Sequence, residues 1–401
     1  MPADPSRPAL LVPIGLLAFA SYTTGSGMRV LDPLLPMVAA EFAVPVSGAA
    51  WLVAGFLLPY GLGQLGFGPL GDRYGKLRVA CLAVVAYAVF TLASALAGGL
   101  NPLTVLRALA GLAAGAVIPL LIAHLGDVVP YAERQAVLGR FGTGMVMAQL
   151  LTGPVAGVLG GAAGWRSVFL LLGVLALVAG GLLVWRLGRA VLTAPAQPTG
   201  GQRTLEAYAG LLGRRAGRWL VLVAFGNGFL LFGGAFPFVG SYLIQDFHLS
   251  TWLAGLVVAG FGIGAFGYTR LARRLVGYFG ERRLLLRGGI GVALGLGGLA
   301  LAPSWPWVVA LQVWLGMAFY MFHGVLQARA TEVLPEARGT AMAGFALSLF
   351  LGQSVGSLAF GLGIALIGYP AAFAVAGVGA LALAVWARTG IPVKGKAVPA
   401  G

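Results

Sequence analysis

The chain has 401 residues, of which 59% are hydrophobic and 9% are charged, and its formal net charge at neutral pH is +15. Soluble domains carry about 25% charged residues, so this composition excludes a water-exposed globular surface and favours one that faces lipid. The single cysteine, Cys81, excludes an intrachain disulfide and a cysteine-based metal site. Because Cys81 stands in an apolar run, we interpret it as a packing residue.

Twelve segments are long and apolar enough to cross a membrane, since about 20 apolar residues span the hydrocarbon core. Lipid offers the backbone no hydrogen-bond partners, so each segment is expected to be helical. The sequence therefore predicts an all-α integral membrane protein. The expected limits are 9–37, 47–69, 77–98, 103–125, 136–160, 166–187, 219–243, 252–271, 284–302, 306–328, 340–366 and 370–388.

Basic residues gather in alternate connections between these segments. The connections after the second, fourth, sixth, eighth and tenth segments carry Lys and Arg, whereas the others carry none except Arg166. Because basic residues remain cytoplasmic, both termini, with Arg7, Lys394 and Lys396, are expected in the cytoplasm, which requires an even number of crossings. The net charge is thus an orientation signal in a cell membrane, with a bacterial inner membrane favoured. We expect the lipid bilayer as a partner, and no nucleic acid.

The one long connection, residues 188–218, contains prolines and glycines and then an amphipathic stretch from Thr204 to Leu212. This pattern predicts a cytoplasmic linker that ends in an interfacial helix. The linker separates an N-terminal six-helix bundle, residues 1–187, from a C-terminal six-helix bundle, residues 219–401.

An internal repeat supports this division of the chain. Asp127–Arg134 leads out of the fourth segment, Glu332–Arg338 leads out of the tenth with a similar pattern, and the two stretches begin 205 residues apart. Parallel six-helix repeats, related by an axis along the membrane normal, are a known plan of transporters. The repeat therefore predicts two pseudo-symmetric bundles.

Two charged residues, Arg29 and Asp32, stand inside the first apolar segment. Charges inside a membrane are costly and usually functional, and residues three apart on a helix share a face and can pair. Pairing favours the ionised carboxylate of Asp32, whereas burial favours the protonated acid. Asp32 is therefore a candidate proton site, with a static ion pair or a surface position as the alternatives.

The connection after the second segment reads Gly68-Pro-Leu-Gly-Asp72-Arg73-Tyr-Gly75-Lys76. It resembles the signature loop of the major facilitator superfamily, in which two glycines and an acid–base pair precede a third glycine and a base. With the twelve segments and the repeat, the resemblance covers the whole chain and implies the major facilitator fold and transport by alternating access.

The resemblance also implies a cytoplasmic gate made by Gly68, Asp72, Arg73, Gly75 and Lys76. In the family, the carboxylate docks at a helix N-terminus of the other half, which corresponds here to 339–341 and is physically favourable because that terminus is partly positive. A local Asp72–Arg73 pair on a solvated turn is the alternative. The matching loop of the second half lacks an acid in the place of Asp72, which predicts an asymmetric gate.

Two further segments are similar to helices of the drug:proton antiporters in this superfamily, as is the stretch around Arg29 and Asp32. Arg107 in the fourth segment matches an arginine linked to proton transfer, although Ala110 replaces the usual glutamine of that motif. The resemblance implies that Arg29, Asp32 and Arg107 couple transport to protons. For Arg107, a purely structural pairing with an acid of the first segment is the alternative.

The fifth segment contains Gly153-Pro154-Val-Ala-Gly157, which resembles the antiporter motif with incomplete glycine spacing upstream. Proline removes a backbone hydrogen bond and bends a helix, so this helix can rock against a neighbour. The resemblance implies proton-coupled efflux, by antiport, of a small amphipathic or drug-like solute. A plain kink with no bearing on transport direction is the alternative.

Other polar or aromatic residues inside the segments are candidates for the substrate cavity. The polar ones equally suit hydrogen bonds between helices, and lipid-facing placement is the alternative for the aromatic one. The candidates are Tyr60, Gln64, Gln149, Asn227, Phe236, His323, Gln327 and Gln353.

The sequence contains no catalytic triad, phosphate-cradling loop or set of residues at metal-ligand spacing. We therefore expect no enzymatic activity, no metal and no cofactor, with the proton gradient as the energy source. Small-molecule solute and protons are the expected partners of a monomer. Export or import of sugars, amino acids or other metabolites, and a membrane sensor without transport, are the alternative functions.

Overall fold

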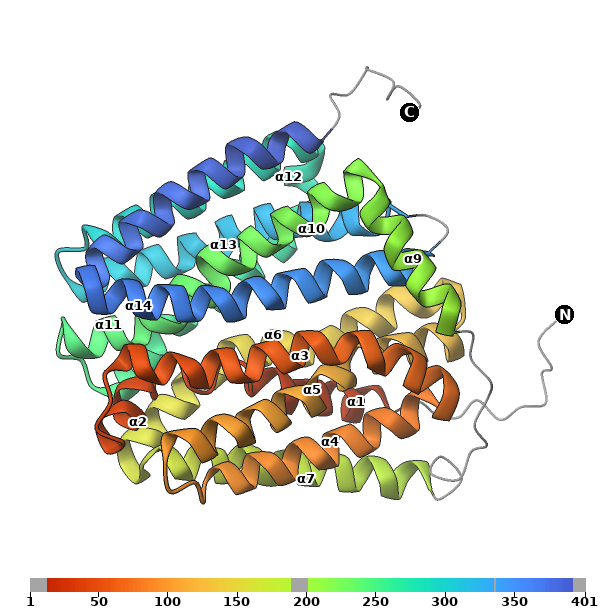
Figure 1. The fold of residues 1–401 in the computed structure, drawn as a ribbon, viewed down its shortest axis with the longest axis horizontal. Helices are drawn as coiled ribbons and strands as arrows, with labels where there is room; N and C mark the ends of the chain where they lie inside the picture. Colours follow the sequence, from red (N-terminus) through yellow and green to blue (C-terminus); the bar gives the residue numbers. More distant parts are fainter. Residues whose placement is uncertain (1–12, 189–200, 335–336, 392–401) are drawn as a thin grey trace, which may run out of the picture.

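The computed structural model describes residues 13–188, 201–334 and 337–391, and every regular element in these ranges is a helix (Figure 1). The predicted all-α membrane protein is thereby confirmed. In this part of the chain, nine helical segments are long and apolar enough to cross a membrane. Arg7, Lys394, Lys396 and much of the expected linker lie outside the described residues.

The helices form two bundles that lie one above the other in Figure 1. The N-terminal bundle contains α1 (Ile14–Ser26), α2 (Leu35–Glu41), α3 (Val46–Tyr74), α4 (Lys76–Ser94), α5 (Leu100–Val128), α6 (Tyr131–Ala163) and α7 (Trp165–Leu187). The C-terminal bundle follows α9 (Gly201–Gly213) and contains α10 (Arg215–Asn227), η1 (Gly228–Ala235), η2 (Phe236–Phe238), α11 (Val239–Gln245), α12 (Thr251–Ala300), α13 (Trp305–Ala330), α14 (Arg338–Ala387) and η4 (Arg388–Gly390).

Two of the apolar helices, α12 and α14, contain 50 residues each and are long enough to cross a membrane twice. Each turns back at a glycine, Gly280 or Gly368, whose φ angles of 69° and 76° belong to the left-handed region. Glycine adopts this region without a steric penalty because it has no Cβ. Counting both helices twice, and adding the interrupted first segment, is consistent with twelve crossings.

The first segment was expected to be one helix over 9–37, and this expectation is wrong. Helix α1 ends at Ser26, eight residues of turns follow, and α2 begins at Leu35. Pro33 and Pro36 explain part of the interruption, because proline lacks a backbone donor and disfavours helical geometry in the residue before it. Arg29 and Asp32 consequently lie in the break rather than on one helical face.

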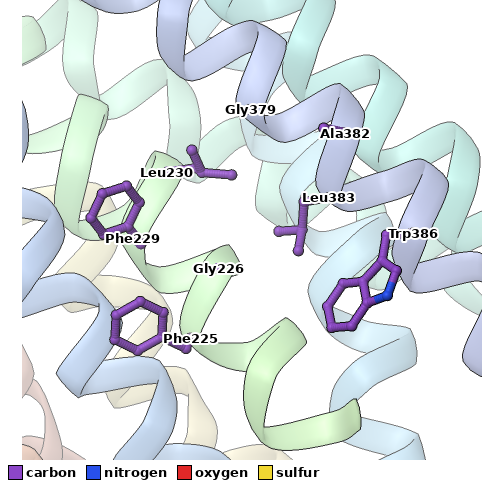
Figure 2. Close-up of a pocket in the computed structure, with 8 residues that line it drawn as sticks. All are labelled: Phe225, Gly226, Phe229, Leu230, Gly379, Ala382, Leu383 and Trp386. Atoms are coloured by element: carbon purple, nitrogen blue, oxygen red, sulfur yellow. The ribbon is translucent and has the colours of Figure 1, made fainter.

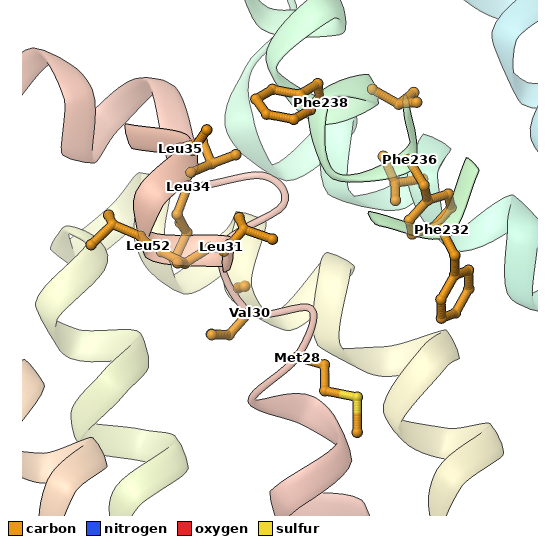
Figure 3. Close-up of a cluster of buried hydrophobic side chains, with 14 of the residues drawn as sticks. Met28, Val30, Leu31, Leu34, Leu35, Leu52, Phe232, Phe236 and Phe238 are labelled. Carbon is orange, nitrogen blue, oxygen red and sulfur yellow. The ribbon is translucent and has the colours of Figure 1, made fainter. Parts of the chain in front are cut away.

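The first segment of the C-terminal bundle is also irregular in its middle. Helix α10 passes into the π-helix η1, then into the 3-10 turn η2, before α11 restores α-helical geometry. Figure 3 shows this stretch, with Phe232, Phe236 and Phe238, across from the broken chain that carries Met28 to Leu35. Interrupted helices free backbone groups for other partners and often occur at functional sites.

The bundles are in close contact toward one end of the seam. We call the end at which α1 begins, α7 ends and α10 begins the linker end, and the other, where α2 and α11 lie, the far end (Figure 1). Toward the far end, Ser354 Oγ donates to the Ala54 carbonyl over 3.1 Å, and a Cβ on Gly240 would stand 2.5 Å from the Asp32 carbonyl. At the linker end, a Cβ on Gly68 or Gly339 would meet nothing within 4 Å.

Helix α9 crosses the linker end beside the start of α14. Its Leu211 is buried against Leu334 and Ala341, and a Cβ on Gly344 would approach the Leu211 side chain to 2.7 Å. A helix therefore exists where the amphipathic stretch was noted. Its interfacial placement stays a prediction.

Candidate functional site

The break in the first segment buries an ion pair at the seam between the bundles. Arg29 and Asp32 are 5% and 2% exposed, and Arg29 Nη1 lies 3.6 Å from Asp32 Oδ2. The same Nη1 donates a hydrogen bond of 3.1 Å to the Phe232 carbonyl of the other bundle. Among the described residues, neither Asp32 oxygen accepts a hydrogen bond, and Arg29 Nε and Nη2 have no acceptor. Such unsatisfied buried groups are expensive and often mark a functional site.

Aromatic rings of the C-terminal bundle enclose the Arg29 guanidinium. Its central carbon lies 3.8 Å from the ring centre of Phe232 and 4.5 Å from that of Phe236. A desolvated cation over an aromatic face is stabilised by about 2 kcal/mol. The two rings join Phe261 and Phe319 in a buried cluster with ring centres 4.5–5.9 Å apart, which we call the phenylalanine quartet.

Arg107 holds the broken chain against its own bundle. Its Nη2 donates to the Gly27 carbonyl over 2.8 Å, and its Nε donates to the Leu52 carbonyl over 3.5 Å. The side chain is 2% exposed, and its guanidinium lies 4.2 Å from the centre of the Phe56 ring. Arg107 therefore bonds to backbone and positions the segment that carries Arg29 and Asp32, and it forms no ion pair with another described residue.

The signature loop forms a charged cluster within one bundle. Gly75 has a φ angle of 95° and turns the chain between α3 and α4. Lys76 Nζ then lies 2.6 Å from an oxygen of Asp127 and 3.6 Å from one of Asp72, whereas Arg73 stacks on the ring of Tyr74. The local partner of Asp72 is thus Lys76 rather than Arg73. Docking of Asp72 at 339–341 stays a prediction for a conformation closed at the linker end.

The Gly-Pro motif of α6 lies at the seam, facing α12. A Cβ on Gly157 would stand 2.5 Å from the Thr251 carbonyl, and one on Gly153 would stand 3.0 Å from the Gly255 carbonyl. Pro154 lies inside the helix between them. Small residues on both helices let the backbones approach closely. This contact joins the two bundles, so a movement of one bundle against the other would change it.

The remaining cavity candidates fall into three groups. Asn227 and His323 meet through Nδ2 and Nδ1 at 3.1 Å, and the His323 ring stacks on Phe319 of the quartet at 5.1 Å. Tyr60 is buried against Phe350, with ring centres 4.5 Å apart. The amides differ: Gln353 is buried with an unpartnered Nε2, Gln64 and Gln149 are half-buried, and Gln327 is exposed.

Among the buried polar residues outside the predicted candidates is an amide, Gln312 of α13. It is fully buried, and neither amide atom has a partner among the described residues. The repeat could have found it, because Gln312 follows Arg107 by 205 residues.

An apolar groove of about 400 Å³ lies elsewhere, between the α10–η1 stretch and α14 (Figure 2). Its lining consists of Phe225, Gly226, Phe229, Leu230, Gly379, Ala382, Leu383 and Trp386. None of these side chains carries a charge. Among the described residues, no group of three or more His, Cys, Asp or Glu side chains is placed to hold a metal ion.

Comparison with known proteins identifies the family. The model of the Major Facilitator Superfamily matches residues 15–335 and 235–400, and the chain belongs to this superfamily of secondary transporters and is not an enzyme. An uncharacterised transporter of the superfamily from Bacillus subtilis is 27% identical over 362 residues, which cover 88% of this chain and 86% of the relative.

Two further proteins, one compared by sequence and one by structure, are similar to most of the chain. The cis,cis-muconate transport protein of Acinetobacter baylyi is 26% identical over 379 residues, covering 91% of this chain and 88% of the relative. The crystal structure of a D-xylose–proton symporter superposes with a TM-score of 0.76 at 20% identity, covering 96% of this chain and 99% of that one. The structural likeness confirms the fold.

Proposed function

We propose that this protein is a proton-coupled secondary transporter of a small amphipathic solute, with the Arg29–Asp32 pair as its coupling site. The observation that carries the proposal is the buried Asp32 carboxylate, which accepts no hydrogen bond from the described residues and lies 3.6 Å from a guanidinium that reaches into the other bundle. A proton on this carboxylate changes the charge at the seam between the bundles.

Coupling follows from the position of Arg29 between its two partners. An ionised Asp32 draws Arg29 toward its own bundle, whereas the Phe232 carbonyl and the quartet hold it in the other. Protonation of Asp32 removes the first attraction and changes the balance between the two conformations of the seam. A ligand shifts such an equilibrium only through differential affinity, so proton and solute must differ in their preference for the two conformations.

The orientation that supports this mechanism puts the linker end in the cytoplasm of a bacterial cell and the far end outside. Basic residues remain on the cytoplasmic side, and Arg73, Lys76 and Arg78 cluster at the linker end. The seam is packed toward the far end, which supports a conformation that is closed to the outside. In the opposite conformation, we propose that Asp72 docks at the start of α14 and closes the linker end.

The Gly-Pro motif supports efflux by antiport as the direction of transport. Gly153 and Gly157 meet the backbone of α12 across the seam, and Pro154 weakens the helix between them. A helix that bends at the seam can follow the rocking of the bundles in a monomer.

Proteoliposomes test the coupling. We expect a drug-like solute to drive proton movement in vesicles that contain the wild type, and Asp32→Asn to abolish this movement while the protein remains folded. Glu133→Gln, which alters an exposed acid of α6, is the matched control and should behave like the wild type. Unchanged proton movement in Asp32→Asn would remove Asp32 from the coupling role.

Proton-linked uptake of a metabolite is the second candidate function. It is favoured by the likeness to a cis,cis-muconate transport protein and by the charges buried among the described residues, which are Arg29, Arg107 and Asp32 and sum to a positive value while Asp32 is ionised. The same vesicles distinguish the candidates, because a symporter moves protons with the solute and an antiporter moves them against it.

A further inference from the structure

The Arg29 guanidinium has one edge that is used and one that is free. Nη1 faces both the Phe232 carbonyl and the Asp32 carboxylate. Nε and Nη2, which share the other edge, are buried and have no acceptor among the described residues. Two parallel N–H groups on one edge match the two oxygens of a carboxylate, which is the strongest and most directional partner of arginine. The free edge therefore has the geometry that binds a carboxylate.

The surroundings of this edge favour a flat, unsaturated ligand. The rings of Phe232 and Phe236 lie 3.8 and 4.5 Å from the guanidinium carbon. Phe319 backs the first ring at 4.7 Å, and Phe261 backs the second at 4.5 Å. Aromatic faces and edges pack best against other planar π-systems, so a planar ligand suits a guanidinium that already stacks on aromatic rings.

The site is covered in the conformation described here. Arg29 belongs to the N-terminal bundle and the quartet to the C-terminal bundle, so opening the seam at the far end separates them and uncovers both the free edge and the ring faces. The apparent affinity of a ligand is then reduced by the fraction of molecules in the open conformation.

Protonation of Asp32 strengthens carboxylate binding. A solute carboxylate and the Asp32 carboxylate compete for the same guanidinium, so neutralising Asp32 leaves Arg29 to the solute. The charged and titratable groups that face the pair from the other elements are Arg107 of α5 and Tyr320 of α13. Arg107 adds positive charge, which also favours an anion.

We propose that the free Nε–Nη2 edge of Arg29 recognises the carboxylate of a small planar anion, carried together with the proton on Asp32. This inference rests on the proposed coupling at Asp32, and between the two candidate functions it favours uptake. The ligand class is thus an aromatic or conjugated monocarboxylate or dicarboxylate.

Binding of benzoate to purified protein in lipid nanodiscs tests the proposal, with the neutral benzamide as the matched ligand. We expect benzoate to bind at acidic pH and benzamide to bind at least tenfold more weakly. Arg29→Lys keeps the charge but loses the two-pronged edge, so its affinity for benzoate should also fall at least tenfold. Arg270→Lys is the matched control, because Arg270 stacks on Phe266 in a comparable way at the exposed surface of α12. Benzoate affinity should not change there.

A second variant keeps the test decisive if Arg29→Lys fails to fold. In Asp32→Asn, benzoate should bind with an affinity that no longer depends on pH. Equal binding of benzoate and benzamide to the wild type would overturn the carboxylate site, even if proton-coupled transport of another solute were observed. Carboxylate binding through Arg29 without solute-driven proton movement would instead preserve the site and overturn the proposed coupling.

Discussion

The two bundles repeat one packing frame and fill it with different chemistry. A Cβ on Gly111 would stand 2.1 Å from the Phe56 carbonyl, and one on Gly316 would stand 2.0 Å from the Phe261 carbonyl. Each of the two residues in the second contact lies 205 positions after its counterpart in the first. The second and fourth crossings of each bundle therefore approach one another equally closely, through a glycine at the same place in the repeat.

The polar positions on this frame have diverged. Arg107 donates to two backbone carbonyls of its own bundle, whereas Gln312, its counterpart, finds no partner for either amide atom in the part of the chain that the structure describes. The N-terminal bundle carries the buried charges, and the C-terminal bundle supplies the aromatic rings and a carbonyl to receive one of them. The comparison teaches that the repeat preserves helix packing while the chemistry is divided between the halves.

The charged clusters at the linker end share one arrangement, a base between two acids, but the charges stand at different positions of the repeat. In the first bundle, Lys76 lies between Asp72 and Asp127. In the second, Arg329 lies between Glu281 and Glu332. Glu281 occupies the position equivalent to Lys76, so the acid that the second loop lacked at the place of Asp72 is found four residues later. Each loop remains neutralised, but only the first presents an exposed aspartate for docking.

The largest difference between the bundles is expected from removing their buried polar side chains. Arg107→Met should destabilise the protein by about 3 kcal/mol, because it leaves the buried carbonyl of Gly27, which lies outside any helix, without its charged donor. Gln312→Met should be neutral or stabilising by about 1 kcal/mol, because it removes two unsatisfied atoms. Chemical unfolding in detergent measures both. Equal destabilisation by the two variants would show that Gln312 has a partner in solution.

A smaller and symmetric effect is expected from the conserved contact. Gly111→Ala and Gly316→Ala each place a Cβ against a backbone carbonyl, so the helices must separate at a cost of about 1–3 kcal/mol. Gly277→Ala is the control, because its Cβ would meet nothing within 4 Å. Thermal unfolding should give similar melting temperatures for Gly111→Ala and Gly316→Ala, both below that of the control. Clearly different melting temperatures for Gly111→Ala and Gly316→Ala would contradict the structural equivalence of the two contacts.

The smallest effect concerns two acids at the far end, Glu41 and Asp246, which are also 205 residues apart. Slight burial opposes ionisation of Glu41, but hydrogen bonds from Arg166 and Trp165 outweigh it and hold its pKa below the usual range. Partial burial raises the pKa of Asp246, and the nearby His248 only partly offsets this.

Opposite pH dependences follow for these two acids. Glu41 contributes stability above the pKa of the unfolded carboxyl, and that stability is lost as the pH falls through the lowered folded pKa. Ionised Asp246 costs stability at neutral pH, and the cost disappears as the pH falls through its raised pKa. At neutral pH, Glu41→Gln should therefore destabilise and Asp246→Asn should stabilise, each by less than about 1 kcal/mol because both groups are exposed. Unfolding scans across acidic pH measure the effect, and shifts of the same sign would contradict the assignment.

The sequence alone predicted the architecture because hydropathy, the basic connections and the repeat are all local or periodic signals. The repeat alone would also have pointed to Gln312. The break in the first segment was foreshadowed by Pro33 and Pro36, but the length of the apolar run favoured a continuous helix. The π-helix of η1 gives a weaker signal: three of its eight residues are glycines and Pro237 follows it, but both residue types are also common in regular membrane helices.

The partners of Arg29 were less accessible to prediction. Asp32 was found because it is three residues away, whereas the Phe232 carbonyl lies 203 residues distant. A backbone acceptor has no sequence signature, and it becomes available only because η1 departs from α-helical hydrogen bonding. Backbone geometry also decides the partner of Asp72. The turn at Gly75 brings Lys76 toward Asp72, which pairs with it rather than with the adjacent Arg73.

The anchor that Arg29 finds on the main chain of Phe232 is hidden from conventional mutagenesis. Exchanging Phe232 for any other residue alters a ring and leaves the oxygen where it was, so a scan of the second bundle would attribute the whole contact to aromatic character. Amide-to-ester replacement at Gly233 weakens that oxygen as an acceptor and leaves every side chain in place. This replacement therefore distinguishes the contribution of the hydrogen bond between the bundles from the contribution of the Phe232 ring.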